Sequence, residues 1–354
     1  MEKFRRIGIL TSGGDAPGMN AAIRAVTREA IRCGVEVVGI YRGYSGLIGG
    51  DVKTFSLRDV SNILNHGGTI LYSDRCPEFK TAEGMQKAIA TCKKYNIDGV
   101  VAIGGDGTFR GATDLTNHGI PCVGIPGTID NDITSTDNTI GFDTAMNTVI
   151  EMIDRLRDTC ESHARCNVVE VMGRNAGDIA LRTAIASGAT AVAISEIPFD
   201  KEALFEKIRA SKVLGKRNFI VVVSEGMGSK FGPSLTTEIE EATGIETRFA
   251  RLAHVIRGGT PTLRDRVLAS DMGKHAVEEL FRGNSNLVVC ERDNKLISTD
   301  ISFALVLDRM YKGKLKDGDL DRFSADEVKE MQALCARKKA TLADLYELSE
   351  HLSL

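Results

Sequence analysis

The sequence contains no tryptophan, only seven prolines and no long hydrophobic run among its 354 residues. No apolar stretch approaches the roughly 18–20 residues that span a bilayer. With 45 Lys and Arg against 48 Asp and Glu, the net charge is −3. A chain without a basic excess has no domain-wide field that would attract nucleic acid. We therefore expect neither a membrane nor a nucleic acid among its partners.

The eight cysteines include no C-x-x-C pair, so the spacing typical of a zinc site is missing. The short apolar run at the N-terminus ends at Thr11–Asp15, which is typical of a first strand and its turn rather than of a secretory signal. Scattered cysteines without such a signal indicate reduced thiols. We therefore expect a cytoplasmic protein.

What is present indicates an α/β protein. An apolar content of 42% and a charged content of 26% are ordinary for a globular chain, and the length suggests two domains. Short buried strands at 7–10, 98–103 and 121–125 each run into a turn and then a helical pattern, and a second set of alternating strands and helices lies between 167 and 290. This alternation predicts parallel, doubly wound sheets.

The C-terminal tail differs in kind from the rest. Ser324–Glu327 fits a capping box, and Thr341–Asp344 gives another helix start. The tail is therefore predicted to form two short amphipathic helices that join near Lys338 and Lys339.

The stretch Gly124–Asp132 carries the clearest indication of function. Its buried strand is broken at Pro126, and the polar residues that follow are Thr128, Asp130 and Asp132. Ligands of open α/β sheets bind beyond the carboxyl ends of strands. The alternative is an acidic surface turn, since Asp, Asn and Gly are turn residues. A second polar turn at another strand end, Gly104–Thr108, favours the functional interpretation.

These turns together can supply the chemistry of phosphoryl transfer. That reaction needs backbone donors and cations on the phosphates, Mg²⁺ held by a carboxylate, and a base near the attacking hydroxyl. Turns such as Gly13-Gly14 can supply donors, and Asp130 can supply the base. Arginines beside glycines or strand ends can hold phosphate oxygens, and they are Arg75, Arg165, Arg174, Arg248 and Arg257. Taken singly, each has an ordinary alternative as a solvated side chain.

At this point the sequence closely resembles the bacterial ATP-dependent 6-phosphofructokinase family. The resemblance runs from about Ile7 to about Asp308. The matching stretches are LTSGGDAPGMNAAIR (Leu10–Arg24), IGGDGTF (Ile103–Phe109), PGTIDND (Pro126–Asp132), TIGFDTA (Thr139–Ala145), VVEVMGRNAGD (Val168–Asp178) and HVIRGGTP (His254–Pro261).

The resemblance implies two similar Rossmann-like three-layer domains with parallel-rich sheets and an interdomain active-site cleft. Residues 1–141 plus about 256–318 would form the large ATP-binding domain, 142–255 the small fructose 6-phosphate-binding domain, and 319–354 a C-terminal helical extension. The enzyme would be a homotetramer with active sites shared between subunits. It would transfer the γ-phosphoryl group of ATP to the 1-hydroxyl of fructose 6-phosphate in glycolysis, with Mg²⁺ as cofactor.

The resemblance also implies roles for individual residues. Asp130 would be the general base, Thr128 and Asp132 would place the hydroxyl and the metal, and Asp106 would contact Mg²⁺. Arg75 and Arg174 would stabilise charge on the transferring group. The nucleotide would be bound by Gly14, Arg75, Cys76, Gly105, Asp106, Gly107 and Thr108. The sugar phosphate would be bound by Thr128, Asp130, Asp132, Met172, Gly173, Arg174, Glu225, His254 and Arg257, with Arg165 and Arg248 reaching in from a neighbouring subunit.

The effector positions depart from the pattern of the regulated family members. Four positions match the basic ones of the inter-subunit site for ADP or phosphoenolpyruvate: Arg24, Arg28, Arg157 and Lys216. Four others stand where better-known members carry an acid, an acid, a base and a histidine: Asn62, Thr190, Leu214 and Asn218. We therefore expect weak regulation by either ligand.

Two other functions remain open from the sequence. A pyrophosphate-dependent enzyme of this family characteristically has an acid at the position of Gly107 and a lysine at that of Gly127. Glycine at both favours ATP, on the reasoning that side chains there would intrude on the path of the nucleotide phosphates. A catalytically silent sugar-phosphate-binding subunit would be expected to lack Asp106 or Asp130, and both are present.

Overall fold

The computed structural model describes residues 4–353, which divide into two compact units. The first unit contains residues up to 129, together with 133–143 and 257–335, and the second contains 130–132, 144–256 and the residues from 336 onward. Each unit has its own sheet and its own buried core.

The first unit is built on a seven-stranded sheet with the order β11-β10-β5-β4-β1-β2-β3. Its strands are β1 (Arg6–Thr11), β2 (Glu36–Ile40), β3 (Val52–Phe55), β4 (Gly99–Gly104), β5 (Cys122–Pro126), β10 (Leu287–Arg292) and β11 (Lys295–Asp300). The two edge strands pair antiparallel with their neighbours, and all the internal pairs are parallel. Every residue of β4 and β5 is buried, as expected for strands covered on both faces.

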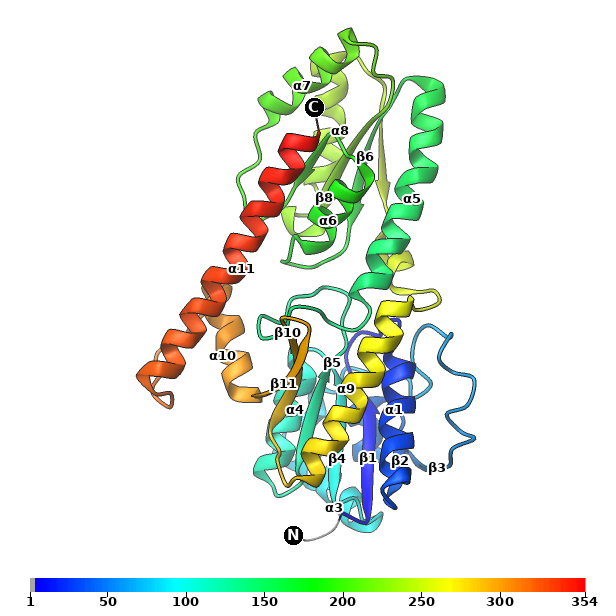
Figure 1. Cartoon of the computed structure of the whole chain (residues 1–354), viewed down its shortest axis with the longest axis vertical. Helices are drawn as coiled ribbons and strands as arrows, with labels where there is room; N and C mark the ends of the chain where they lie inside the picture. The colour runs from blue at the N-terminus through cyan, green and yellow to red at the C-terminus, as the bar shows by residue number, and fades with distance from the viewer. Residues whose placement is uncertain (1–3, 354) are drawn as a thin grey trace. The chain divides into compact units, whose positions relative to one another are not determined.

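Helices cover both faces of this sheet (Figure 1). They are α1 (Met19–Arg32), α2 (Gly43–Gly49), α3 (Ala82–Lys94), α4 (Asp106–Asn117), α9 (Leu263–Phe281) and α10 (Ile301–Tyr311), with the short 3-10 helix η1 (Pro77–Lys80). Helices α1 and α9 lie side by side and approach closely at Gly273, where a Cβ would lie 2.9 Å from the Ala22 carbonyl oxygen. The result is the three-layer arrangement predicted from the sequence.

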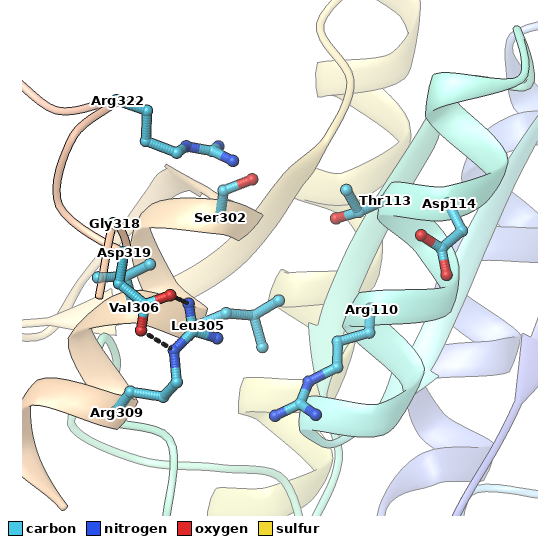
Figure 2. A pocket seen from close by; sticks show the side chains of 10 residues that line it. All are labelled: Arg110, Thr113, Asp114, Ser302, Leu305, Val306, Arg309, Gly318, Asp319 and Arg322. Atoms are coloured by element: carbon cyan, nitrogen blue, oxygen red, sulfur yellow. Dashed lines mark hydrogen bonds and ion pairs between the residues drawn. The ribbon is translucent and has the colours of Figure 1, made fainter. Parts of the chain in front are cut away.

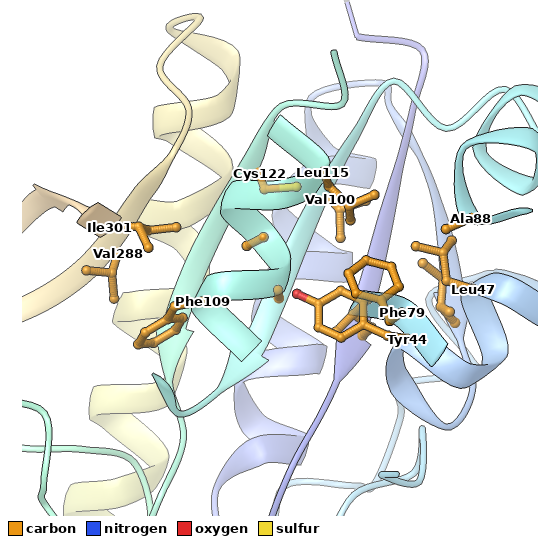
Figure 3. Packing of buried hydrophobic residues seen from close by; sticks show 14 of the residues in the cluster. Tyr44, Leu47, Phe79, Ala88, Val100, Phe109, Leu115, Cys122, Val288 and Ile301 are labelled. Carbon is orange, nitrogen blue, oxygen red and sulfur yellow. The ribbon is translucent and has the colours of Figure 1, made fainter. Parts of the chain in front are cut away.

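A continuous hydrophobic core joins α2, α3 and α4 to one face of this sheet (Figure 3). The Tyr44 ring stacks on Phe79 with centroids 4.1 Å apart. Its hydroxyl donates to the Thr108 carbonyl oxygen at 2.6 Å, and burial raises the pKa of Tyr44 well above its usual value. Because the tyrosine contacts the first turn of α4, the core fixes the helix that carries Asp106.

The second unit has a four-stranded, fully parallel sheet with the order β7-β8-β6-β9. Its strands are β6 (Cys166–Val171), β7 (Ala191–Ala193), β8 (Phe219–Ser224) and β9 (Thr247–Arg251). Its helices are α5 (Phe142–His163, which begins in the first unit), α6 (Asp178–Ser187), α7 (Lys201–Val213) and α8 (Phe231–Thr243), with η2 (Glu225–Met227) and η3 (Ala253–Arg257). Every residue of β6 and β8 is buried.

The prediction of two short C-terminal helices is wrong, because α11 runs without a break from Ala325 to Leu352. The capping box at Ser324 and Glu327 does begin it, because the Ser324 N–H donates to the Glu327 carboxylate at 2.7 Å and the Glu327 N–H donates to the Ser324 hydroxyl at 3.3 Å. Thr341 does not start a new helix, since its hydroxyl donates back to the Arg337 carbonyl oxygen at 3.1 Å. No glycine or proline interrupts the segment, so nothing in the backbone forces a break.

None of the helices among residues 4–353 combines the length and the hydropathy needed to cross a bilayer.

Candidate active site

In the first unit, the predicted nucleotide turns meet at the adjacent ends of β1 and β4. The Ser12 N–H donates to the Ile103 carbonyl oxygen at 3.0 Å, and the Thr108 hydroxyl donates to the Ser12 carbonyl oxygen at 3.1 Å. A Cβ on Gly104 would lie 2.4 Å from that same carbonyl oxygen, so only glycine allows this approach. Around Gly105 and Gly107, by contrast, a Cβ would meet nothing within 4 Å. The turn is rigid at its base and open at its tip.

Asp106 is the first residue of α4, where the helix dipole favours a negative group or a bound anion. Its Oδ1 atom is buried and has no hydrogen-bond partner among the described residues, while Oδ2 lies 3.9 Å from the Lys312 ammonium. Mg²⁺ in phosphate sites is bound by one or two carboxylates together with waters and substrate phosphates. Within residues 4–353 no group of three or more His, Cys, Asp or Glu could hold a metal, and the Oδ1 atom of Asp106 fits the mode with one carboxylate.

A second carboxylate, which sequence reasoning missed, lies behind Asp106. Asp308 on α10 is 3% exposed, and its Oδ1 accepts the Thr134 N–H at 2.5 Å. Burial is the main reason that the pKa of Asp308 rises to about 8, and the charge of Asp106 acts in the same direction while Lys312 opposes it. No motif marks Asp308 in the sequence, because its significance depends on its interaction with Asp106, about 200 residues away.

The remaining nucleotide and phosphate residues of this unit surround the β1 turn. Arg257 pairs with Asp15 at 2.6 Å, and its guanidinium lies 2.6 Å from where a Cβ on Gly14 would be. Glycine at position 14 therefore makes room for an arginine that the sequence assigned to the other substrate. Arg75 is exposed, and Cys76, which precedes η1, packs against the core cluster. Their loop is joined to the β1 turn, because the Ser73 hydroxyl donates to the Gly13 carbonyl oxygen.

At Gly127 the space beside the backbone is filled by side chains of the first unit. A Cβ there would point toward Met19 and Ile103, at 2.9 Å and 3.0 Å, which are both buried core residues. Packing against these two side chains is therefore sufficient to explain glycine at this position. Next to it, Thr128 is held by its backbone, since its N–H donates to Ile140 at 3.1 Å and its carbonyl oxygen accepts the Thr139 hydroxyl at 2.6 Å.

In the second unit, the predicted base forms an ion pair with the predicted phosphate-binding arginine. Asp130 is 4% exposed, and its Oδ2 lies 3.0 Å from the Arg174 Nε. Arg174 has φ 53°, in the left-handed region that non-glycine residues rarely adopt. The Glu225 carboxylate holds this backbone, because its Oε1 accepts the N–H groups of Gly173 and Arg174 at 3.1 Å and 2.6 Å. Asp132, two residues after the base, is half-buried.

This arrangement follows from the parallel pairing of β6 with β8, which places Val171 opposite Ser224. Met172 and Glu225 therefore start from neighbouring strand ends. Gly173 has φ 144°, and a Cβ there would lie 2.5 Å from the Ala176 carbonyl oxygen, so the chain turns here only with glycine. Glu225 was predicted to bind the sugar phosphate. In this structure its carboxylate holds the backbone of Gly173 and Arg174.

Two other predicted phosphate ligands lie at the opposite end of the same sheet. Arg165 precedes β6 and Arg248 lies in the first part of β9, and both pair with Glu246, Arg165 at 2.7 Å. The six residues of β6 rise about 3.3 Å each, so roughly 20 Å of strand separates Arg165 from Met172. Within this chain, the two arginines and the Arg174 turn therefore cannot bind one phosphate. His254, on η3, is exposed.

The predicted effector positions of the second unit form a compact group. Asn218 accepts from Arg157 at 2.7 Å and donates to Glu161 at 2.5 Å. Burial lowers the pKa of Lys216, with the nearby charge of Arg157 as a further cause. Leu214 is 87% exposed and contributes no charge where the family carries a base. In the first unit, Arg24 is half-buried and Arg28 is exposed on α1, while Asn62 has φ 58°.

A separate pocket of about 270 Å³ lies in the first unit between α4 and α10 (Figure 2). Arg309 closes one side, held by two bonds of 2.7 Å and 2.9 Å to Asp319. Arg110 and Arg322 extend from the other sides. None of the residues predicted for either substrate lines this pocket, so it is distinct from the candidate site.

Two α/β units with parallel-rich sheets, whose strand-end turns carry glycines, carboxylates and arginines, are characteristic of α/β phosphotransferases. A family model described as Phosphofructokinase matches residues 6–280. The chain belongs to the phosphofructokinase family.

Relatives of known name give the same assignment. The chain is 55% identical over 298 residues to the ATP-dependent 6-phosphofructokinase of Bacillus licheniformis, which covers 84% of this chain and 93% of that protein. It is 55% identical over 302 residues to the ATP-dependent 6-phosphofructokinase of Halalkalibacterium halodurans, which covers 85% and 94%. Among solved structures, phosphofructokinase from Saccharomyces cerevisiae superposes with a TM-score of 0.85 at 30% identity, covering 98% of this chain and 50% of that one. The chain thus spans about half of the yeast chain.

Proposed function

We propose that this protein transfers the γ-phosphoryl group of ATP to the 1-hydroxyl of fructose 6-phosphate, giving fructose 1,6-bisphosphate and ADP. The observation that carries the proposal is the buried Asp130 carboxylate paired with Arg174 directly after β5. A carboxylate in this position can take a proton from a hydroxyl, and a guanidinium beside it can accept phosphate oxygens. The names of the relatives support ATP as the donor. We expect the enzyme to act in cytoplasmic glycolysis.

The roles of the first unit follow from its turns. Backbone N–H groups at the start of α4 and in the β1 turn would bind the nucleotide phosphates, with Gly107 and Thr108 in the first helical turn. The Asp106 carboxylate would hold Mg²⁺, which supplies charge neutralisation to the phosphates when bound. Arg257, which reaches the β1 turn through Asp15, would neutralise a phosphate there. Arg75, exposed on the adjoining loop, would assist it.

In the second unit, the catalytic roles belong to Asp130 and to the residues around it. As the oxygen of the sugar 1-hydroxyl attacks the γ-phosphorus, its proton passes to the Asp130 carboxylate, and the bond from the γ-phosphorus to the bridging oxygen of ADP breaks. Arg174 pairs with Asp130 through Nε and is 58% exposed at its side chain, so the rest of its guanidinium would be accessible to the charge that moves onto the phosphoryl group. Asp132 would position the hydroxyl, a role that the resemblance also gives to Thr128 of the first unit. Met172, Gly173 and His254 would contact the sugar phosphate.

Two of the cations predicted for the sugar 6-phosphate lie away from the Arg174 turn within one copy of the chain. Arg165 and Arg248 lie at the far end of β6 and β9, paired with Glu246. A symmetric assembly would supply them to a neighbouring copy, since an isologous interface exchanges the same residues in both directions. Such an exchange requires at least a dimer, and the resemblance implies a homotetramer with shared sites.

The decisive experiment is a coupled assay of fructose 6-phosphate phosphorylation with purified protein. We expect turnover with Mg²⁺ and ATP and little with pyrophosphate. Asp130→Ser should lower kcat by about 10²–10⁴, as is typical for a positioned base, without a comparable change in the half-saturating fructose 6-phosphate. Equal turnover of pyrophosphate would contradict the choice of donor, and near wild-type kcat in the variant would contradict the role of Asp130.

A further inference from the structure

The C-terminal helix α11 lies beyond the residues that the family model matches, which end at 280. Its second half belongs to the second unit, the same unit as the turn at 130–132. There, the Lys207 ammonium contacts Ser353 and lies 3.4 Å from the Glu350 carboxylate. Ser349 and Ser353 are buried. The end of α11 is therefore packed against its unit and is not a free tail.

Lys338, near the middle of this helix, contacts the residue between the two acids of the catalytic turn. Its Nζ donates to the Asn131 carbonyl oxygen at 3.0 Å. Asn131 is 3% exposed and has φ 50°, in the left-handed region. A buried carbonyl oxygen needs a hydrogen-bond partner, and an ammonium donor gives a stronger bond than a neutral one.

This contact bears on catalysis because Asn131 directly follows Asp130. The left-handed conformation of Asn131 sets the orientation of the peptide groups on either side of it. It therefore also sets the direction in which the Asp130 side chain projects from the main chain. Such conformations are maintained only when surrounding contacts enforce them. A cation on α11 that holds the Asn131 carbonyl oxygen provides one such contact.

We propose that Lys338 is a positioning residue for the catalytic base, and that α11 serves to bring it to the turn. Lys338 acts through the Asn131 backbone and does not touch the substrate. The inference rests on the proposed function, in which Asp130 is the base. It also gives the extension a role that does not depend on effectors.

The test compares Lys338→Met with Lys338→Arg and with the control Lys339→Met. Lys339 is the next residue and is exposed on the same helix. A displacement of the base by about 1 Å is enough to lower the rate about 10²-fold, so Lys338→Met should lose at least about tenfold in kcat. The KM for ATP and the melting temperature should stay close to wild type. Lys338→Arg, which keeps the cationic donor, should restore most of kcat, and Lys339→Met should match wild type.

A measurement independent of activity separates this inference from the proposed function. Amide hydrogen exchange of a peptide spanning Asn131 should be faster in Lys338→Met than in wild type and in Lys339→Met, because the turn loses a contact that holds it. Unchanged exchange together with unchanged kcat would overturn the inference. So would a loss of kcat that Lys338→Arg does not restore and that falls in step with the melting temperature, since Lys338 would then be needed only for folding. If wild-type protein did not phosphorylate fructose 6-phosphate, the proposed function would fail, and the exchange result would still decide whether Lys338 holds the turn.

Discussion

Replacing Glu225 tests how the backbone around Arg174 supports catalysis. Its single Oε1 atom accepts two N–H groups, from Gly173 at 3.1 Å and from Arg174 at 2.6 Å. Hydrogen bonds to a charged group contribute about 1.5–3 kcal/mol each, so the pair contributes at most about 3–6 kcal/mol. The left-handed conformation of Arg174 opposes them by about 1–2 kcal/mol. Without the carboxylate, the turn is free to relax and the guanidinium leaves Asp130.

If about 3 kcal/mol of this stabilisation is used to align Arg174, Glu225→Ala should lower kcat/KM for fructose 6-phosphate about 10²-fold. Glu225→Gln keeps an accepting oxygen but loses the charge, and a loss of about 1–2 kcal/mol corresponds to roughly tenfold. Both values come from steady-state kinetics with fructose 6-phosphate as the varied substrate. The KM for ATP should change little, because the two N–H groups that Glu225 accepts belong to its own unit.

The matched control is Glu206→Ala, an exposed glutamate on α7 of the same unit. It should behave like wild type. A folded Glu225→Ala protein with kcat/KM within about threefold of wild type would refute the reasoning, since the two bonds would then have no part in placing Arg174.

Three further predictions concern other parts of the chain. At pH 8, a thiol reagent should rapidly modify only the half-buried Cys33 and Cys76, because the other six cysteines are buried and burial raises thiol pKa values, for example to about 12 for Cys122. Rapid modification of more than two thiols in the folded protein would contradict this. The pKa of Asp319 is lowered by the Lys316 N–H and by Arg309, so its stabilisation is complete above the unfolded-state pKa of about 4 and is lost as the pH falls below it. Asp319→Asn should therefore reduce the melting temperature more at pH 7 than at pH 3, and an equal reduction at both would count against the pair. Millimolar ADP or phosphoenolpyruvate should shift the half-saturating fructose 6-phosphate by less than about twofold, since a ligand that does not distinguish two states cannot shift them; a several-fold shift would show a working effector site.

Much of the candidate site could be predicted from short stretches of the sequence. Apolar runs that end in glycine turns predicted the strands, and the stretches around Asp106 and Asp130 identified the family on which the roles depend. These signals are local because a strand, its turn and the first turn of a helix involve about a dozen neighbouring residues. The order of the strands is not local, and neither is its consequence that Glu225, which follows β8, lies beside the turn after β6 that carries Arg174.

Tertiary structure decided what the local signals left open. The sequence predicts a helix start at Thr341, yet α11 continues through it. The Thr341 hydroxyl donates to the Arg337 carbonyl oxygen of the preceding turn and so does not cap a new helix. The same continuation brings Lys338 to Asn131, 207 residues away in sequence. Asp308 likewise gains its raised pKa only by burial beside Asp106. Sequence alone determined the chemistry of the turns, and contacts between distant segments determined how each charged group is held.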